Sequence, residues 1–257
     1  MDFTGAVIDY GTYPEQNRSY FTLRDATKTL SKAFPAESLE ARIYLGLQEL
    51  TQKLFCKYSR EDGSELSLDR LLIDANWAPS EDSVYSFCRK RDRVLPSHGR
   101  YVGASSKPFA EYKRKKGDWV GHNWRVPAVK GTKMVRHALY DTNYWKTFSH
   151  QRMRLQPASR GSLSFYGTTA YDHRLISEQL TSEYRVATAG RERELHEWKH
   201  RPERFDNHWF DGVVGCCVAA SMEGCAIEQT VTTKAKQSGA VSFAEQQKAA
   251  KAKRARR

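Results

Sequence analysis

Three aspartates of this sequence follow or interrupt apolar segments. Asp9 lies near the end of GAVIDY, Asp74 ends the run LLID, and Asp211 is followed by the apolar run GVVGCCV. An isolated carboxylate is costly to bury, so an acid in such a place needs a cation beside it or an edge that faces solvent. Carboxylate oxygens are also the ligands that Mg²⁺ takes in proteins. These three residues are therefore the first candidates for chemistry.

Three carboxylates at one place would form a site for two divalent cations. Two such ions, roughly 4 Å apart, can hold both the attacking water and the departing 3′ oxygen of a phosphodiester bond. Other interpretations stay open for each acid. Asp74 could be a solvated residue that starts a turn before Pro79, and Asp211 could face solvent on the outer side of a helix. Whether the acids do chemistry depends on whether the fold brings them together.

The elements expected around these acids favour convergence. Apolar and β-branched residues predict strands over 5–10 and 68–74, and apolar spacings of three and four predict a helix over 36–55 between them. A helical crossover makes the two strands parallel and adjacent, so Asp9 and Asp74 would emerge at the same edge of a sheet. A last helix, starting near Asp206, would carry Asp211. Asp206 itself fits an N-cap or first-turn acid.

The remaining pattern completes an α/β chain. A strand over 19–24 is expected to form a hairpin with the first strand, and RVLPS (93–97) is a further short strand. Helices are expected over 80–91, 142–153 and 173–184. DWVGHNWRVPAV and KMVRHALYD together favour a two-stranded excursion.

Positive charge is concentrated in two regions of the chain. The net charge is +12; residues 107–136 contribute +7, residues 234–257 another +7, and the rest is close to neutral. Two concentrated basic regions suggest a polyanion such as DNA as the partner, although a solvated loop and a solubilising tail remain the alternative. The candidate DNA-binding residues are Lys107, Lys113, Arg114, Lys115, Lys116, Arg125, Lys130 and Lys133.

Several classes of protein are disfavoured by composition. The aromatic content of 12% is too high for a disordered chain, and no apolar run approaches the roughly 20 residues of a membrane-spanning helix. The start MDFTGAVIDY lacks the features of a secretory signal, so we expect a soluble intracellular protein. The five cysteines include no CxxC pair and fit buried reduced thiols. HEWKH (196–200) could place two histidines on one helix face, but a solvated helix surface is the simpler interpretation.

Five segments, in this order along the chain, form a recognisable set. They are AVIDYGTYPEQ, LLIDANWAPSEDSVYSFCR, VLPSHGRYVGASSKPFAEYKRKKGD, HRLISEQLTSEYRV and DNHWFDGVVGCCVAASM. The set, which spans roughly residues 3–225, resembles the C-terminal nuclease domain of the large terminase subunit of tailed bacteriophages, in its GpA-like branch. The resemblance implies an RNase H-like α/β fold: a mixed sheet flanked by helices over residues 1–229, with a basic insertion at about 99–160 before the last helices. Residues 230–257 are then expected to be a disordered basic tail.

The resemblance also implies an activity and its partners. Three acids of the family bind two Mg²⁺ or Mn²⁺ ions and cut concatemeric double-stranded DNA during genome packaging; here they fall on Asp9, Asp74 and Asp211. The implied partners are DNA, the portal, the small terminase subunit and a separate packaging ATPase, in the cytoplasm of the bacterial host and without a membrane. Asn76 and His208 lie near the acids in sequence, but no family role is assigned to them.

One departure from the complete large terminase limits this assignment. The chain has no G-x-x-x-x-G-K-[ST] motif, so the packaging motor is not assigned to these residues, and a fragment, a split gene and an isolated domain all remain open. Two rival functions also stay open: an RNase H-like resolvase or ribonuclease that uses the same acids, and a catalytically inactive DNA-binding or portal-docking module.

Overall fold

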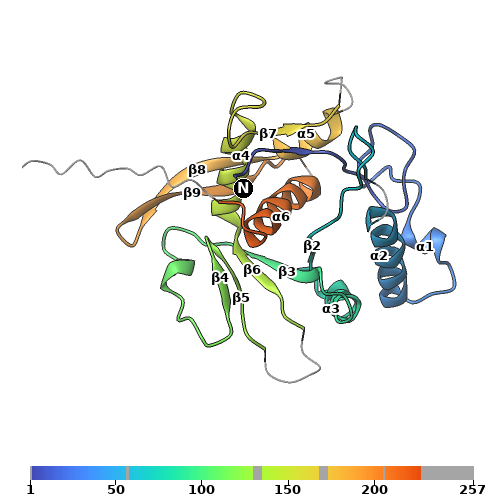
Figure 1. Ribbon diagram of the computed structural model, residues 1–257, viewed down its shortest axis with the longest axis horizontal. Helices are drawn as coiled ribbons and strands as arrows, with labels where there is room; N and C mark the ends of the chain where they lie inside the picture. Colours follow the sequence, from blue (N-terminus) through green and yellow to red (C-terminus); the bar gives the residue numbers. More distant parts are fainter. Residues whose placement is uncertain (1, 56–57, 130–134, 168–172, 205, 227–257) are drawn as a thin grey trace, which may run out of the picture. The chain divides into compact units, whose positions relative to one another are not determined.

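The largest sheet of the computed structural model is mixed and has five strands (Figure 1). In spatial order these are β2 (Leu71–Asp74), β3 (Val94–Arg100), β6 (Ala138–Asp141), β5 (Trp124–Val126) and β4 (Trp119–Gly121). β2, β3 and β6 run parallel, whereas β5 is antiparallel to both β6 and β4. The structure describes residues 2–55, 58–129, 135–167, 173–204 and 206–226, all of which belong to one compact unit. The expected tail, like Lys130 and Lys133, lies outside the described residues.

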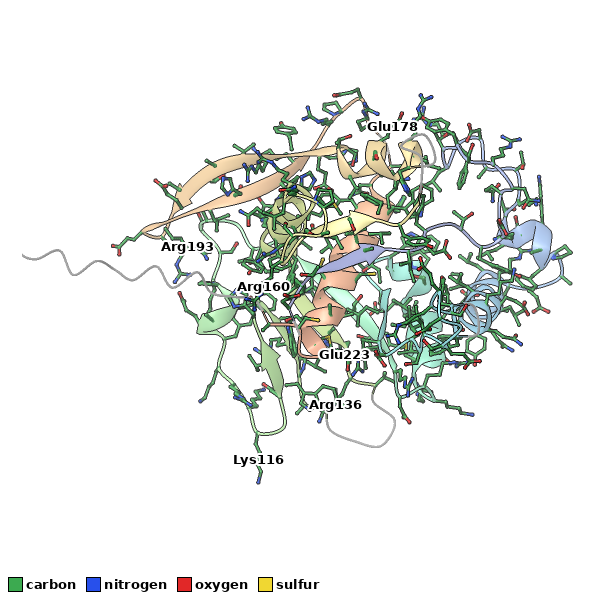
Figure 2. All side chains as sticks on the ribbon, turned by 45° about the horizontal axis from the view of Figure 1, so that its top comes forward. Lys116, Arg136, Arg160, Glu178, Arg193 and Glu223 are labelled. Carbon is green, nitrogen blue, oxygen red and sulfur yellow. The ribbon has the colours of Figure 1, made fainter. Side chains whose placement is uncertain are left out.

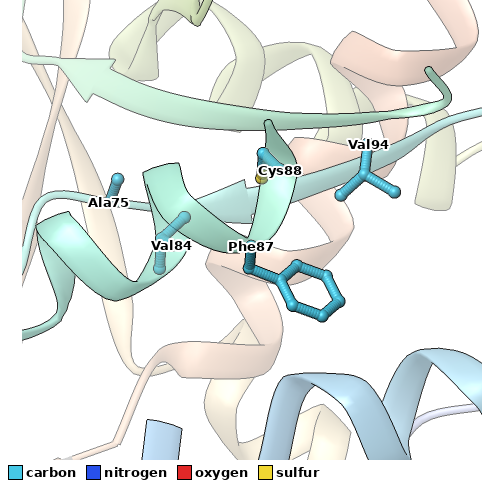
Figure 3. Packing of buried hydrophobic residues seen from close by; sticks show 5 residues of the cluster. All are labelled: Ala75, Val84, Phe87, Cys88 and Val94. Carbon is cyan, nitrogen blue, oxygen red and sulfur yellow. The ribbon is translucent and has the colours of Figure 1, made fainter. Parts of the chain in front are cut away.

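The first helical layer packs beside β2 and β3. It contains α2 (Leu39–Phe55) and α3 (Glu81–Cys88), which contact each other, with α1 (Leu30–Ala33) against α2 and the 3-10 turn η1 (Ala78–Ser80) leading into α3. The core between α3 and the strands is shown in Figure 3 and consists of Ala75, Val84, Phe87, Cys88 and Val94, and Tyr44 and Leu47 of α2 pack against it. Each Val or Phe buried in this way contributes about 1.5–3 kcal/mol. This core holds the end of β2, and with it Asp74.

A second, aromatic core holds the helix that carries Asp211. α6 (His208–Met222) packs against α4 (Thr142–Met153), α5 (Arg174–Leu180) and β2. Trp145 and Phe210 are fully buried, and Trp198 contacts Phe210 with ring centroids 5.4 Å apart. Trp198 comes from β9 (Arg193–His200), which pairs with β8 (Glu183–Gly190) as an antiparallel hairpin.

The first strand is placed differently from the expectation. β1 (Gly5–Val7) pairs in parallel with β7 (Leu163–Phe165), and in the described part of the chain these two strands form a sheet of their own. The predicted adjacency of the strands that carry Asp9 and Asp74 is therefore wrong. The crossover rule assumes that both strands join the same sheet, and here they do not.

The expected hairpin partner of the first strand is also absent from the described structure. Residues 19–24, all of them described, form bends and turns. Their polar groups are used elsewhere: Tyr20 Oη donates to Glu178 Oε2 (2.6 Å), and the Leu23 backbone N–H donates to Asp206 Oδ2 (3.1 Å). The Leu23 N–H, which a strand would use to pair with β1, is therefore already hydrogen-bonded to another part of the chain.

Most other predicted elements are confirmed with small shifts of boundary. The helix over 142–153 is α4. The expected two-stranded excursion is wrong in its pairing, because β4 and β5 both come from DWVGHNWRVPAV, whereas KMVRHALYD contributes β6, the strand of the main sheet that pairs with β3 and β5. HEWKH lies in β9 and not in a helix. Cys88, Cys216, Cys217 and Cys225 are free thiols; Cys88 and Cys217 are buried as expected, whereas Cys216 is exposed and Cys225 is half-buried. None of the described helices is long and apolar enough to cross a membrane.

Candidate active site

Asp74 and Asp211 lie close enough for their charges to interact. Asp74 ends β2, and α6, which carries Asp211, packs against that strand. The surrounding protein raises the pKa of Asp74 by desolvation, and the negative charge of Asp211 raises it further, against a hydrogen bond from the Asn76 backbone N–H that lowers it. Two acids that repel each other in this way both gain from a cation between them.

A buried tyrosine senses the charges of both acids. Tyr140 lies on β6, the central strand, and is 5% exposed. Burial raises the pKa of its hydroxyl strongly, and the charges of Asp74 and Asp211 both add to that rise. Side chains from β2, β6 and α6 therefore meet at this edge of the parallel strands.

Asp211 has a cationic partner that the sequence pattern did not reveal. Lys146 Nζ, on α4, lies 3.0 Å from Asp211 Oδ1 and 2.5 Å from Glu183 Oε1. The Asn207 side-chain amide donates to the same Glu183 oxygen (2.8 Å). The Glu183 side chain is 5% exposed and that of Asp211 is 47% exposed, so the network runs from the interior to the surface. A neighbouring cation or a solvent-facing edge was expected for Asp211, and the structure provides both.

Asp9 lies two residues beyond β1 and approaches a neighbouring part of α6. Its Oδ2 accepts a hydrogen bond from Tyr58 Oη (2.8 Å), and burial together with this bond raises the pKa of Tyr58. The next turn contacts α6, because Trp209 Nε1 donates to the Gly11 carbonyl (3.2 Å) and the rings of Tyr10 and Trp209 lie 5.3 Å apart.

The structure thus brings Asp74 and Asp211 together and places Asp9 beside the start of the same helix. Among the described residues, no group of three or more His, Cys, Asp or Glu side chains is arranged to hold a metal ion. The convergence of all three acids stays a prediction.

The two polar residues noted beside the acids differ in their surroundings. The Asn76 backbone N–H donates to Asp74 Oδ1 (3.3 Å), and its side-chain amide reaches the Gly99 carbonyl (3.4 Å) and the His98 ring (3.1 Å). His208 is the exposed first residue of α6. His98, on β3, was not singled out from the sequence because nothing in RVLPSHGR distinguishes it.

Asp141 is a further acid at the carboxyl end of the parallel strands. It caps α4 by accepting a hydrogen bond from the Tyr144 N–H (3.1 Å), and its burial raises its pKa to about 6. Asp141 pairs in register with Arg100 of β3. Asp74 pairs with Ser97 of β3, which in turn pairs with Ala138 of β6, so Asp141 lies three residues further along β6 than the position level with Asp74. Its capping role is the one expected of an Asp directly before a helix.

The basic run 113–116 is presented by an ordered turn. Asp118, whose side chain is 1% exposed, accepts hydrogen bonds from the backbone N–H groups of Lys115 (2.9 Å) and Ala128 (2.8 Å) and pairs with Arg125 (2.7 Å). These hydrogen bonds lower the pKa of Asp118. The four cations of the run are exposed, and Figure 2 shows Lys116 projecting from the turn.

Two further cations of the basic region stack on aromatic rings. Arg136 lies over Trp119 (4.6 Å to the ring centroid), and Lys107 lies 5.8 Å from the Tyr112 ring centroid. Trp119 is 47% exposed. The surface around β4 therefore offers both positive charge and flat apolar area.

A mixed α/β fold with paired carboxylates at the edge of its parallel strands and a basic surface on another part of the sheet is consistent with an RNase H-like nuclease. Residues 40–231 match the family model of the terminase large subunit gpA endonuclease domain, and the chain belongs to this family. Asp74 and Asp211 lie within the matched residues, and Asp9 lies before them. No curated protein and no solved structure matches the chain.

Proposed function

We propose that this domain is a metal-dependent endonuclease that cuts double-stranded DNA, with Asp74 and Asp211 as its central metal-binding acids. The observation that carries the proposal is the packing of α6, which holds Asp211 in its first turn, against β2, which ends at Asp74. An all-oxygen donor set suits Mg²⁺ or Mn²⁺. Bound divalent cations would supply activation of water and stabilisation of the leaving 3′ oxygen.

The protein residues have distinct tasks in this proposal. Asp74 and Asp211 provide ligand oxygens, and Lys146 holds one oxygen of Asp211 in place. Asp9 would supply the third carboxylate, since the turn that follows it contacts α6, the helix that carries Asp211. The nuclease domain would span residues 1–229, and its substrate would be the concatemeric DNA of genome packaging in the cytoplasm of the bacterial host.

The basic turn and its surroundings would hold the flanking phosphates. Lys113, Arg114, Lys115 and Lys116 are exposed and would make these contacts, because exposed cations on an ordered turn can reach a phosphate backbone without rearrangement. Lys107, Lys130 and Lys133 are proposed to extend the path. Arg125, which was a candidate too, pairs with Asp118 and is better explained as an anchor of the turn.

The proposed partners other than DNA are inferred from the family to which the chain belongs, and not from the geometry of the site. The portal, the small terminase subunit and a separate packaging ATPase would deliver the DNA to this domain. A catalytically inactive DNA-binding or portal-docking module is the competing proposal, and the cleavage assay described next separates the two.

Asp74→Asn tests the proposed chemistry directly. Asn is nearly isosteric with Asp but removes one negative charge from the metal site, so cleavage of plasmid DNA in Mn²⁺ should fall by at least about 10³-fold, in line with several kcal/mol of lost charge stabilisation. Chelator should abolish wild-type cleavage, and DNA binding should persist in the variant. RNA–DNA hybrids and four-way junctions, offered beside the plasmid, identify a different substrate if one is preferred.

Asp82→Asn is the matched control. Asp82 is an exposed acid in the first turn of α3, eight residues after Asp74, and belongs to neither the site nor the core. It should cut as the wild type does. If Asp74→Asn retains near wild-type cleavage, Asp74 is an ordinary turn residue; if the wild type binds DNA and never cuts it, the inactive module is correct.

A further inference from the structure

His98 has hydrogen-bond partners for both of its ring nitrogens. The residue lies on β3 and is 8% exposed. Its Nε2 lies 2.9 Å from Tyr85 Oη on α3, and its Nδ1 lies 3.1 Å from Asn76 Oδ1 in the loop after β2. A buried ring held at both ends cannot turn freely, so it fixes the distance between α3 and this loop.

The direction of these hydrogen bonds follows from the Asn76 amide. Its Nδ2 donates to the Gly99 carbonyl (3.4 Å), which leaves Oδ1 facing His98. An amide oxygen only accepts, so His98 Nδ1 must be the donor. Burial and the nearby Arg100 lower the pKa of His98, which keeps the ring neutral near pH 7. Nε2 of a neutral ring then accepts from the Tyr85 hydroxyl.

The chain of hydrogen bonds continues to the proposed metal ligand. The Asn76 backbone N–H donates to Asp74 Oδ1 (3.3 Å). The orientation of the Asp74 carboxylate therefore depends on the position of Asn76, whose side chain is held by His98 at its oxygen and by the Gly99 carbonyl at its nitrogen. Asn76 is exposed, so packing around its side chain is not what holds it.

We propose that His98 is a positioning residue that orients Asp74 for metal binding through Asn76. The inference rests on the proposed function and adds a residue that touches neither metal nor DNA. Groups that orient metal ligands from behind typically change metal affinity by 10–100-fold when they are replaced. The effect of losing His98 should accordingly appear in Mn²⁺ affinity and not in DNA affinity.

Two replacements of His98 separate its two hydrogen bonds. Asn places an amide N–H near the position of Nδ1 and can still donate to Asn76, whereas Gln reaches the position of Nε2 and can serve only Tyr85. We expect His98→Gln to weaken Mn²⁺ binding by about 10-fold, and His98→Asn to weaken it by about threefold or less. Both variants lose ring packing against Tyr85 and His137, so a merely structural role would affect them alike.

The measurement is Mn²⁺ titration of each folded variant, by calorimetry or by the electron paramagnetic resonance of free Mn²⁺, with DNA affinity measured in parallel without metal. Asn76→Ala serves as a second variant in case His98→Gln fails to fold, because Asn76 is exposed; it should also weaken Mn²⁺ binding about 10-fold. Equal Mn²⁺ affinities in His98→Asn and His98→Gln, or wild-type affinity in Asn76→Ala, would overturn the inference.

Asp74→Asn distinguishes a failure of this inference from a failure of the proposed function. If Asp74→Asn weakens Mn²⁺ binding and the His98 and Asn76 variants do not, only the positioning role is wrong. If Asp74→Asn binds Mn²⁺ as the wild type does, Asp74 is not a ligand, and the proposed function and the positioning role fail together.

Discussion

Two aspartates of the same sheet, Asp118 directly before β4 and Asp74 at the end of β2, have opposite surroundings. Asp118 accepts hydrogen bonds from two backbone N–H groups and an arginine, and its pKa is lowered. Within the described part of the chain, Asp74 is hydrogen-bonded only by backbone N–H groups of its own loop, is exposed to the charge of Asp211, and has a raised pKa. An acid that anchors a turn is satisfied by the protein, whereas an acid proposed to bind metal is left for a ligand to satisfy.

The largest effect is expected at Lys146, which pairs with Asp211 of the proposed metal site and with the buried Glu183. Lys146→Met would leave Glu183 buried without its ammonium partner, and breaking a buried pair from one side typically costs about 3–5 kcal/mol of unfolding free energy. Lys146→Met/Glu183→Gln should recover most of that loss, because no unpaired charge stays buried. Urea denaturation measures both. If the single variant is as stable as the double, Glu183 is not the partner that requires Lys146.

Asp141 tests an intermediate case, since it is both hydrogen-bonded and buried. Its pKa of about 6 is higher than that of an unfolded Asp, near 3.9, so its contribution to stability is fully present below about pH 4 and is lost as the pH rises through 6. Asp141→Asn keeps a good N-cap and should stabilise the protein at pH 7 by up to about 3 kcal/mol.

The measurement is thermal unfolding of the wild type and Asp141→Asn between pH 4 and 7.5. The gap between their unfolding free energies should widen as the pH rises across that range. A gap that is constant with pH would show that Asp141 ionises as easily in the folded protein as in the unfolded chain.

Replacing each of the two aspartates with Asn should change the melting temperature in opposite directions. Asp118→Asn should lower the melting temperature at pH 7, since it removes acceptors for donors that are already buried and leaves Arg125 without its partner. Asp74→Asn should leave the melting temperature unchanged or raise it, since a carboxylate with a raised pKa is ionised at a cost. Differential scanning calorimetry without divalent ions gives both values. Equal shifts of the same sign would remove the distinction between anchor and ligand.

The smallest expected effect concerns the cations that Asp118 presents. Replacing Lys113, Arg114, Lys115 and Lys116 with Ala should weaken DNA binding equally for all sequences and reduce the salt dependence by about 0.9 log unit per lost phosphate contact. Fluorescence anisotropy at several salt concentrations measures the slope. A control variant replaces Glu37, Glu40 and Glu49, in and just before α2, with Gln. It changes the net charge by three at positions distant in sequence from the basic run. An unchanged slope in the basic variant would identify the run as a solvated loop.

Local patterns in the sequence were sufficient for α4 and for the end of β2 at Asp74, because helix periodicity, an N-cap and a strand end are all set by neighbours in sequence. The β8–β9 hairpin was missed for an equally local reason. Its two-residue turn is Arg191–Glu192, both with positive φ (48° and 59°), where Asn-Gly or Asp-Gly is the usual signal.

The candidate site was predictable only in part. The placement of Asp74 at a strand end and of Asp211 early in an apolar helix was visible in the sequence, and the structure packs that helix against that strand. Lys146 and Glu183 are separated by 37 positions, and no short-range pattern links them. The position of Asp9 could not be derived either, because β1 joins β7, a strand of three residues that lies about 160 residues further along the chain.

The ordered state of the basic turn has a consequence for the heat and the speed of DNA binding. A loop that becomes ordered only on binding loses about 1–2 kcal/mol of backbone entropy for each residue that it fixes. The turn closed by Asp118 has already lost that freedom when the protein folds, so its encounter with a duplex requires little rearrangement. Binding through this surface should therefore be driven by counterion release with a small change in heat capacity, and its rate should be governed by diffusion and ionic strength.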